Sequence, residues 1–426
     1  MEDNKLVTNH QLADKVQVKD FFKERNVFIT GATGFMGKAL VEKLLWSCED
    51  IGNLYLLIRP KREETAQQRV FRRIKQRNEH DLSKLIPIEG DISDIDLAIS
   101  PEDRILLEEK VSVIFHAASS VRFDDPLKKA VIIFFDGIRY TVKKNSSRKT
   151  NDLNHILTFH LLKLKIDLKI TSHANTYTFS KNLAENVVYE AQCQIPVLIF
   201  RPSIVTSSLA EPIPGWADNL NGPLGICTGY LTGVVHCVFM DGDKVTDYIP
   251  CDYATNALIA STWYRGLINT SDCITSKHLF ASFDLILEKM PLERVMWHPS
   301  VVTTSNRVFY FILLYFTHLL PADTLVLTKL ILNDFCFRMM KLYQKIFLGN
   351  EALSFFLTRT WKIENKNSDL LRTFMHPEDV DIFLFDAEVV NLPEAFILTM
   401  QGIKQHILHE DITEATLAIN RNKNKR

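Results

Sequence analysis

The chain has 426 residues, a formal net charge of −1, 46% hydrophobic residues and 24% charged residues. These values are ordinary for a globular protein of two or three domains, and they show neither the basic excess of nucleic-acid-binding proteins nor an acidic tail. The seven cysteines are scattered without a CxxC pair, which indicates neither a zinc site nor a disulfide framework. Because the N-terminal segment is polar and mixed in charge, it does not resemble a signal peptide, and we expect an intracellular protein that is not secreted. The balanced net charge predicts no nucleic-acid partner.

A dinucleotide-binding motif is predicted near the N-terminus. Residues 27–29 have the pattern of a short apolar strand, the run TGATGFMG follows at 30–37, and an apolar periodicity over 39–45 indicates a helix. Strand, glycine turn and helix occur in the order that such a site needs, although the spacing is GxxGxxG and not GxGxxG. The residues predicted to bind the cofactor here are Thr30, Gly31, Thr33, Gly34, Phe35, Met36 and Gly37.

The second predicted strand, residues 53–58, indicates which nicotinamide cofactor is bound. A site that prefers NAD places an acidic residue after this strand to hold the ribose hydroxyls. This chain has Arg59 there, with Lys61 and Arg62 close behind. A guanidinium suits a 2′-phosphate, so we predict NADPH; the alternative is a solvated basic loop.

Further strands are predicted at residues 85–88, 111–115 and 196–200. Their alternation with helices indicates an α/β fold with a doubly wound parallel sheet, in which the ligand lies at the carboxyl ends of the strands. We expect Asp91 to reach the adenine, and the small residues after the fourth strand to allow close approach of the cofactor. The cofactor-binding residues predicted at these strand ends are Asp91, Ala117, Ala118, Pro202 and Ser203.

Tyr177 and Lys181 lie four residues apart in the stretch HANTYTFSKNLAE, so on a helix they share one face. A lysine ammonium there favours the phenolate and would poise the phenol for proton transfer. The spacing alone also fits two ordinary polar residues on a helix.

The blocks quoted above, together with FHAASSVRFDDPL, IFRPSIV, PLERVMWHPS and FFLTRTWKIEN, resemble the fatty acyl-CoA reductases, and most of all their insect members. This family is a branch of the extended short-chain dehydrogenase/reductases, and the resemblance covers most of residues 20–410. It implies reduction of a long-chain acyl-CoA to a primary alcohol by two hydride transfers from NADPH, with release of coenzyme A. It also implies that Tyr177 is the catalytic acid, and that Lys181 lowers its pKa and binds the nicotinamide ribose.

The chain departs from the family pattern in its middle. The family's active-site Asn corresponds to Phe134, and residues 133–172 hold no counterpart of the strand that carries the catalytic Ser or Thr. Thr171 and Ser172 are weak substitutes, and a second shortening precedes the PLERV block. The alternative function is therefore an NADPH-binding relative with impaired chemistry, for instance an aberrant splice product. A third possibility is another extended dehydrogenase, which the C-terminal blocks argue against.

The predicted domains are a reductase domain at 20–270, an apolar helical region at 271–350, a small helical C-terminal domain at 351–412 and a tail at 413–426. Residues 308–320 are nearly all apolar but are too few to span a bilayer. They are consistent either with a re-entrant or interfacial hairpin or with a buried hairpin over the substrate tunnel. We expect association with the cytosolic face of the endoplasmic reticulum or peroxisome.

Overall fold

The computed structural model describes residues 16–59, 82–118, 176–191, 198–264, 268–269, 273–275, 301–319, 334–361 and 366–410. The chain divides into two compact units that interleave in sequence. The first unit is drawn from residues 1–200, 255–268 and 367–384, and the second from residues 201–254, 269–366 and 385–426. Residues 367–384, which the sequence assigns to the C-terminal domain, therefore pack with the nucleotide-binding part, while the predicted domain boundaries stay predictions.

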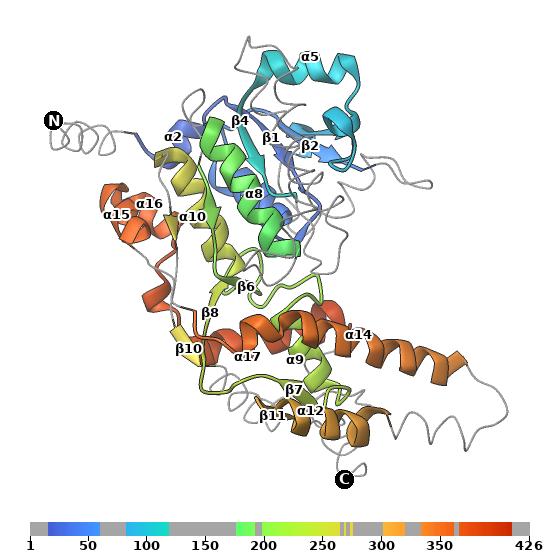
Figure 1. The fold of residues 1–426 in the computed structure, drawn as a ribbon. Coiled ribbons are helices and arrows are strands. Elements are labelled where there is room, and N and C mark those ends of the chain that lie inside the picture. The colour runs from blue at the N-terminus through green and yellow to red at the C-terminus, as the bar shows by residue number, and fades with distance from the viewer. Residues whose placement is uncertain are drawn as a thin grey trace. The chain divides into compact units, whose positions relative to one another are not determined.

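The first unit contains a parallel sheet of four strands in the order β3-β2-β1-β4 (Figure 1). The strands are β1 (Asn26–Thr30), β2 (Leu54–Ile58), β3 (Leu85–Glu89) and β4 (Val111–His116). All five residues of β2 are buried, which explains its continuous apolar sequence LYLLI. The register pairs Thr30 with His116 and Ile58 with Glu89, so the strands end together at one edge of the sheet. This confirms the predicted Rossmann fold.

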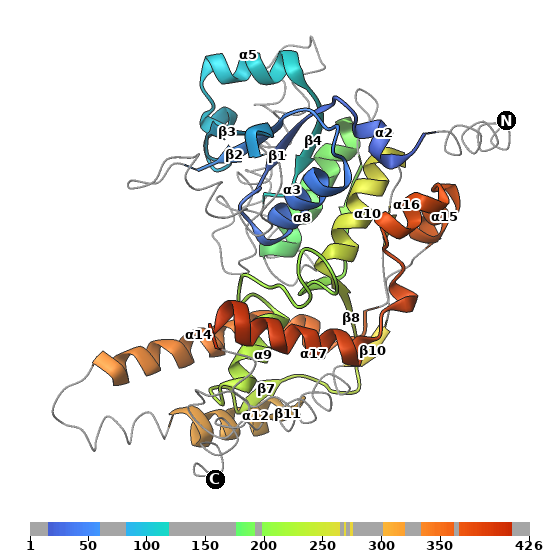
Figure 2. The ribbon, with the colours of Figure 1, turned by 180° about the vertical axis from the view of Figure 1, so that it is seen from behind.

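Helices cover both faces of this sheet, since α3 (Phe35–Ser47) lies in front of it in Figure 2 and α8 (Thr176–Ala191) lies in front of it in Figure 1. The short helix η1 (Leu82–Lys84) precedes β3, and η2 (Ile95–Ala98) follows it. The further helices of this unit are α2 (Val18–Phe22), α5 (Pro101–Lys110), most of α10 (Cys251–Tyr264), most of α15 (Lys366–Phe374), and α16 (Pro377–Ile382). The start of α5 is fixed by its sequence, because the Ser100 hydroxyl accepts a hydrogen bond from the Asp103 amide at 3.0 Å.

Helix α3 is buried on more than its apolar face. The predicted apolar side chains are buried, and so is Lys43, which donates a hydrogen bond to the Ile382 carbonyl at 2.6 Å and lies 5.4 Å from the centroid of the Phe383 ring. Residues 367–384 of the first unit therefore cover the side of α3 that an amphipathic pattern would leave to solvent.

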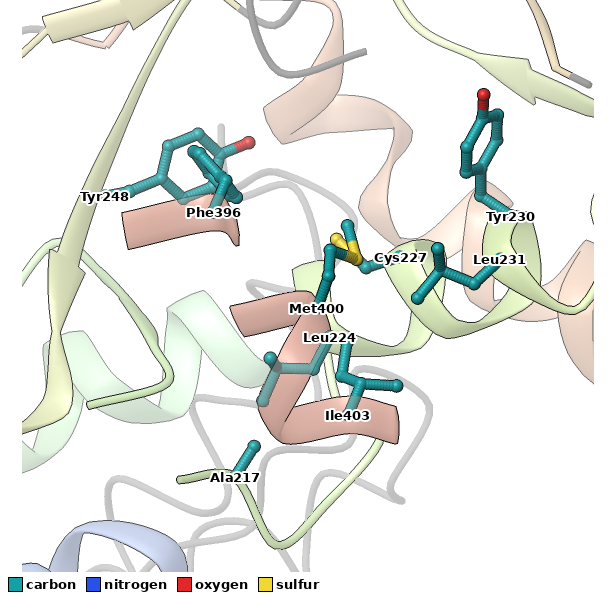
Figure 3. Packing of buried hydrophobic residues seen from close by; sticks show 9 residues of the cluster. All are labelled: Ala217, Leu224, Cys227, Tyr230, Leu231, Tyr248, Phe396, Met400 and Ile403. Atoms are coloured by element: carbon teal, nitrogen blue, oxygen red, sulfur yellow. The ribbon is translucent and has the colours of Figure 1, made fainter. Parts of the chain in front are cut away.

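The second unit combines short strands with helices. Strands β6 (Ile204–Thr206), β8 (Val245–Pro250) and β10 (Cys273–Thr275) form one sheet, and β7 (Cys237–Phe239) pairs with β11 (Val302–Thr304). Helices α9 (Pro223–Leu231) and α17 (Leu392–Gly402), with the π-helical turn η5 (Ile403–Ile407), enclose an apolar core with β8. Figure 3 shows its buried members: Ala217, Leu224, Cys227, Tyr230, Leu231, Tyr248, Phe396, Met400 and Ile403.

The predicted apolar segment near residue 310 is helical. It forms α12 (Arg307–Leu314) and a π-helical turn η3 (Tyr315–Leu319), and α14 (Asp334–Leu357) follows in the chain before η4 (Ala387–Val389). In the part of the chain that the structure describes, no helix combines the length and the hydrophobicity needed to cross a membrane.

Some sequence predictions concern residues that the structure does not describe. Phe134, Thr171, Ser172 and the tail at 413–426 lie outside the described residues. Of the strand predicted at 196–200, the structure describes only the end, where β5 (Phe200–Arg201) pairs with β9 (Ile268–Asn269).

Candidate active site

The glycine turn after β1 brings two strand ends into close contact. Gly31 has a φ of +73°, a left-handed conformation that favours glycine. A Cβ atom on Gly31 would stand 2.6 Å from the Ala118 nitrogen and 2.8 Å from the Ala117 carbonyl carbon. The predicted cofactor residues Gly31, Ala117 and Ala118 are therefore neighbours, and their small size is what allows the backbones to approach.

The same turn begins helix α3. The Gly34 amide donates to the Gly31 carbonyl at 2.8 Å, and Gly34 is the N-cap of α3 without a side-chain cap. Amide groups in the first turn of a helix lack partners within the helix, and the helix dipole favours an anion there. A Cβ atom on Gly37 would overlap the Gly31 carbonyl oxygen, so glycine is required at this position. Thr33, Phe35 and Met36 are partly buried in this turn. These features fit the pyrophosphate of a dinucleotide.

Thr30 organises the end of β4. Its hydroxyl oxygen lies 2.9 Å from Nδ1 of His116 and accepts a hydrogen bond from the Ala118 amide at 3.3 Å. Its carbonyl oxygen accepts from the Ala117 amide at 3.2 Å. One threonine thus joins the last residue of β4 and the two residues that follow it, and the predicted residues Thr30, Ala117 and Ala118 form one hydrogen-bonded group.

His116 is a candidate functional residue that the sequence reasoning did not single out. Burial, and to a smaller extent the nearby charge of Lys181, lowers its pKa to about 4, so the imidazole is neutral at physiological pH. Its Nε2 atom is buried, and no hydrogen-bond partner for it is found among the described residues. The available signal in the sequence was a histidine ending an apolar strand directly before two alanines.

Tyr177 and Lys181 lie in the first two turns of α8. The Lys181 Nζ atom is 5.7 Å from the centroid of the Tyr177 ring, as the four-residue spacing predicts. The resemblance implies that Lys181 lowers the pKa of Tyr177, but burial raises that pKa, because desolvation disfavours the phenolate. Burial also lowers the pKa of Lys181 to about 8, against an opposing effect of Glu185.

Lys181 is close enough to His116, the last residue of β4, for its charge to act on the imidazole. The predicted catalytic pair and the Thr30–His116–Ala118 group therefore belong to the same region of the first unit. That region holds a neutral imidazole, a phenol and a partly desolvated ammonium near the carboxyl end of β4. This set can donate a proton to an oxygen on which negative charge develops.

Arg59 and Asp91 follow the neighbouring strands β2 and β3. The Arg59 Nε atom lies 2.8 Å from an Asp91 carboxylate oxygen. The other oxygen of Asp91 accepts from the Ser93 amide at 2.9 Å and from its hydroxyl at 2.5 Å. The sequence predicts separate roles for Arg59 and Asp91 on the cofactor. The structure pairs them, so that Asp91 holds the guanidinium at the end of β2.

Pro202 and Ser203 belong to the second unit, where they join β5 to β6. The Ser203 hydroxyl oxygen is buried, and the described part of the chain offers it no hydrogen-bond partner. Within the described residues no group of three or more His, Cys, Asp or Glu side chains could hold a metal ion.

Comparisons with known proteins agree with this geometry. A family model described as male sterility protein matches residues 29–258 with its NAD-binding part, and a second one of the same description matches residues 317–410. The chain is 29% identical over 462 residues to the fatty acyl-CoA reductase wat of Drosophila melanogaster, covering 96% of this chain and 89% of that protein. It is 29% identical to fatty acyl-CoA reductase 1 of Homo sapiens, covering 93% of this chain and 87% of that protein.

The alignments with these relatives span 455 and 462 positions, more than the 426 residues of the chain. The relatives therefore have residues without a counterpart here.

Solved structures show the same fold. The chain resembles the terminal reductase domain of the myxalamid biosynthetic pathway with a TM-score of 0.61 at 16% identity, over 91% of this chain and 92% of that one. It resembles the reductase domain of a nonribosomal peptide synthetase from Mycobacterium tuberculosis with a TM-score of 0.57 at 16% identity, over 93% and 95%. The chain belongs to the fatty acyl-CoA reductase family, whose members are NAD(P)H-dependent oxidoreductases built on a Rossmann fold.

Proposed function

We propose that this protein reduces a long-chain fatty acyl-CoA to a primary fatty alcohol with NADPH, releasing coenzyme A. The observation that carries the proposal is the half-buried Tyr177 with Lys181 Nζ 5.7 Å from its ring, in a unit whose Rossmann sheet carries a dinucleotide turn. The proposal is further supported by the fatty acyl-CoA reductases that the chain matches over most of its length.

The residues of the glycine turn would hold the cofactor. The first-turn amides of α3 bind the pyrophosphate, and Gly31, Ala117 and Ala118 leave room for the backbone to approach it. Lys181 binds the nicotinamide ribose. The cofactor, when bound, supplies a hydride to the carbonyl carbon of the substrate.

Tyr177 supplies the proton. As the carbonyl double bond breaks, negative charge develops on its oxygen, and the phenol donates its proton to that oxygen. The raised pKa of Tyr177 keeps the phenol protonated at neutral pH, which is the state that this step consumes. The Lys181 ammonium then stabilises the phenolate that remains. The neutral His116 lies beside Lys181 without adding a competing charge.

The net reaction consists of two successive reductions. The first adds a hydride and a proton to the thioester and gives a hemithioacetal, whose C–S bond breaks to leave an aldehyde and coenzyme A. The second adds a hydride and a proton to the aldehyde and gives the alcohol. Each reduction uses one NADPH and returns Tyr177 to its starting state once the phenolate takes up a proton from solvent.

The preference for NADPH is assigned to Arg59. Because Asp91 holds the guanidinium at the end of β2, Arg59 is available to a 2′-phosphate without first being ordered. Arg59→Ala is expected to reduce the preference for NADPH over NADH, measured as the ratio of the two kcat/KM values, by about tenfold to a hundredfold. An unchanged ratio would remove Arg59 from this role.

The second candidate function is an NADPH-binding protein without turnover. It is favoured by Phe134 at the family's Asn position and by the residues of the relatives that this chain lacks. Purified protein incubated with palmitoyl-CoA and NADPH separates the two, with alcohol detected by gas chromatography. Alcohol from the wild type that disappears in Tyr177→Phe supports the reductase; cofactor binding without product supports the second candidate. The intracellular, membrane-associated location stays a prediction.

A further inference from the structure

The hydrogen bonds around His116 fix which of its two ring nitrogens carries the proton. The Nδ1 atom lies 2.9 Å from the Thr30 hydroxyl oxygen, and the same oxygen accepts a hydrogen bond from the Ala118 amide at 3.3 Å. A hydroxyl has a single hydrogen to donate. Among the described residues, Nδ1 of His116 is the only acceptor found for the hydrogen of the Thr30 hydroxyl. Thr30 therefore donates to Nδ1, and the proton of the neutral imidazole is on Nε2.

This tautomer makes Nε2 of His116 a buried donor. The atom is inaccessible to solvent, and no hydrogen-bond partner for it is found in the part of the chain that the structure describes. The Lys181 ammonium, whose charge acts on the imidazole, has no lone pair and cannot accept from it. Because a buried donor without a partner is costly, such a group at a candidate site indicates an acceptor that a bound molecule supplies.

The neighbours of His116 indicate which molecule this is. Thr30 directly precedes the glycine turn, and a Cβ atom on Gly31 would stand 2.6 Å from the Ala118 nitrogen, so the turn is shaped for close approach of a dinucleotide. Lys181, to which the proposed function assigns the nicotinamide ribose, is close enough to His116 to act on its charge. A ribose hydroxyl oxygen can accept hydrogen bonds from an ammonium and from an imidazole N–H.

We propose that His116 is a further cofactor-binding residue, whose Nε2–H donates to a hydroxyl oxygen of the nicotinamide ribose. This inference rests on the proposed function, which places that ribose at Lys181. Thr30 is then a positioning residue, because its hydroxyl holds the imidazole in the tautomer that donates.

Two substitutions separate the roles of the two ring nitrogens. The amide of Asn reaches the place of Nδ1 and can keep the bond to Thr30, whereas the amide nitrogen of Gln reaches the place of Nε2 and can keep the bond to the ribose. We expect His116→Asn to raise the Kd of NADPH about tenfold, and His116→Gln to stay within about threefold of the wild type, by isothermal titration calorimetry. Both variants are expected to bind 2′-phospho-ADP like the wild type, since this ligand has the pyrophosphate but lacks the nicotinamide ribose.

A matched control is His409→Asn, the same substitution at an exposed histidine of the second unit. It is expected to bind NADPH like the wild type. A measurement on the wild type needs no altered fold: the ¹⁵N signals of the His116 ring, assigned by their absence from His116→Gln, are expected to show the proton on Nε2. The Nε2 signal is expected to move when NADP⁺ is added and to move less with 2′-phospho-ADP.

Unchanged NADPH binding in His116→Asn would overturn the proposal, as would equal weakening of NADPH and 2′-phospho-ADP, because His116 would then act only on the glycine turn. A proton on Nδ1, or a Gln variant as weak as the Asn variant, would also overturn it. None of these readouts needs turnover. A wild type that binds NADPH but forms no alcohol contradicts the proposed reaction and not the role of His116, whereas a wild type that does not bind NADPH contradicts both.

Discussion

Burial controls the chemistry of individual residues at the candidate site. In the proposed mechanism Lys181 carries the positive charge that stabilises the Tyr177 phenolate, and burial lowers the pKa of Lys181 to about 8. Its charge is therefore present below pH 8 and is lost as the pH rises through that value. The pKa of His116 is about 4, so its imidazole is neutral at neutral and alkaline pH and adds no inflection to the pH profile of activity there.

The pH dependence of reduction tests this assignment. We expect kcat/KM of the wild type to fall above about pH 8, approaching tenfold per pH unit. Lys181→Arg keeps a cation at high pH, so its profile is expected to stay flat to about pH 10 even if its plateau is lower. A limb at pH 8 that persists in Lys181→Arg would show that another group titrates there.

The same pKa shift makes a prediction about stability. A lysine whose folded pKa is lowered binds its proton less well in the folded state, so stability increases between about pH 8 and pH 10.5 and is lowest below pH 8. Lys181→Met is therefore expected to raise the melting temperature at pH 7 while reducing activity. A lower melting temperature would show that Lys181 stabilises the fold through contacts that outweigh its desolvation.

Residue types and spacing in the sequence are enough to propose part of the candidate site. Gly31, Tyr177 and Lys181 are predicted because a glycine turn and an i,i+4 pair are local patterns, and Ala118 because small residues follow the fourth strand. The Arg59–Asp91 ion pair was not, since it joins two neighbouring strands whose register the sequence does not state. The raised pKa of Tyr177 depends on burial by the whole unit, which no local pattern records.

At the scale of elements, a glycine is required where a helix packs directly against the backbone of another segment. A Cβ atom on Gly402, at the end of α17, would overlap the carbonyl oxygen of Gly215. Gly402→Ala must push α17 away from this loop and is expected to destabilise the protein by about 1–3 kcal/mol. A Cβ atom on Gly349, within α14, would meet no atom within 4 Å, so Gly349→Ala is expected to stabilise by about 0.5–1 kcal/mol.

Urea denaturation of both variants measures these free energies of unfolding. Equal effects of the two substitutions would contradict the packing of α17 against Gly215.

At this scale the strands of the nucleotide-binding sheet were predictable to within a residue or so, because their apolar runs end in turn residues. The covering of α3 by residues 367–384 was not, because it joins segments more than 300 residues apart.

At the scale of the whole molecule, the interleaved units explain why linear domain boundaries are hard to read from sequence. The chain leaves the nucleotide-binding unit after residue 200 and returns to it twice, at 255–268 and 367–384. The fold class was nevertheless predictable, since alternating strands and helices with a glycine turn specify a Rossmann sheet.

The central claim is that this chain carries out two successive hydride transfers to one carbon. The most direct test is incubation of the purified protein with palmitoyl-CoA and NADPH deuterated at both C4 positions, followed by mass spectrometry of the alcohol. Two transfers predict hexadecanol with two deuterium atoms on C1, and no alcohol from Tyr177→Phe. A product with a single deuterium, an aldehyde that accumulates without further reduction, or labelled alcohol from Tyr177→Phe would contradict the account.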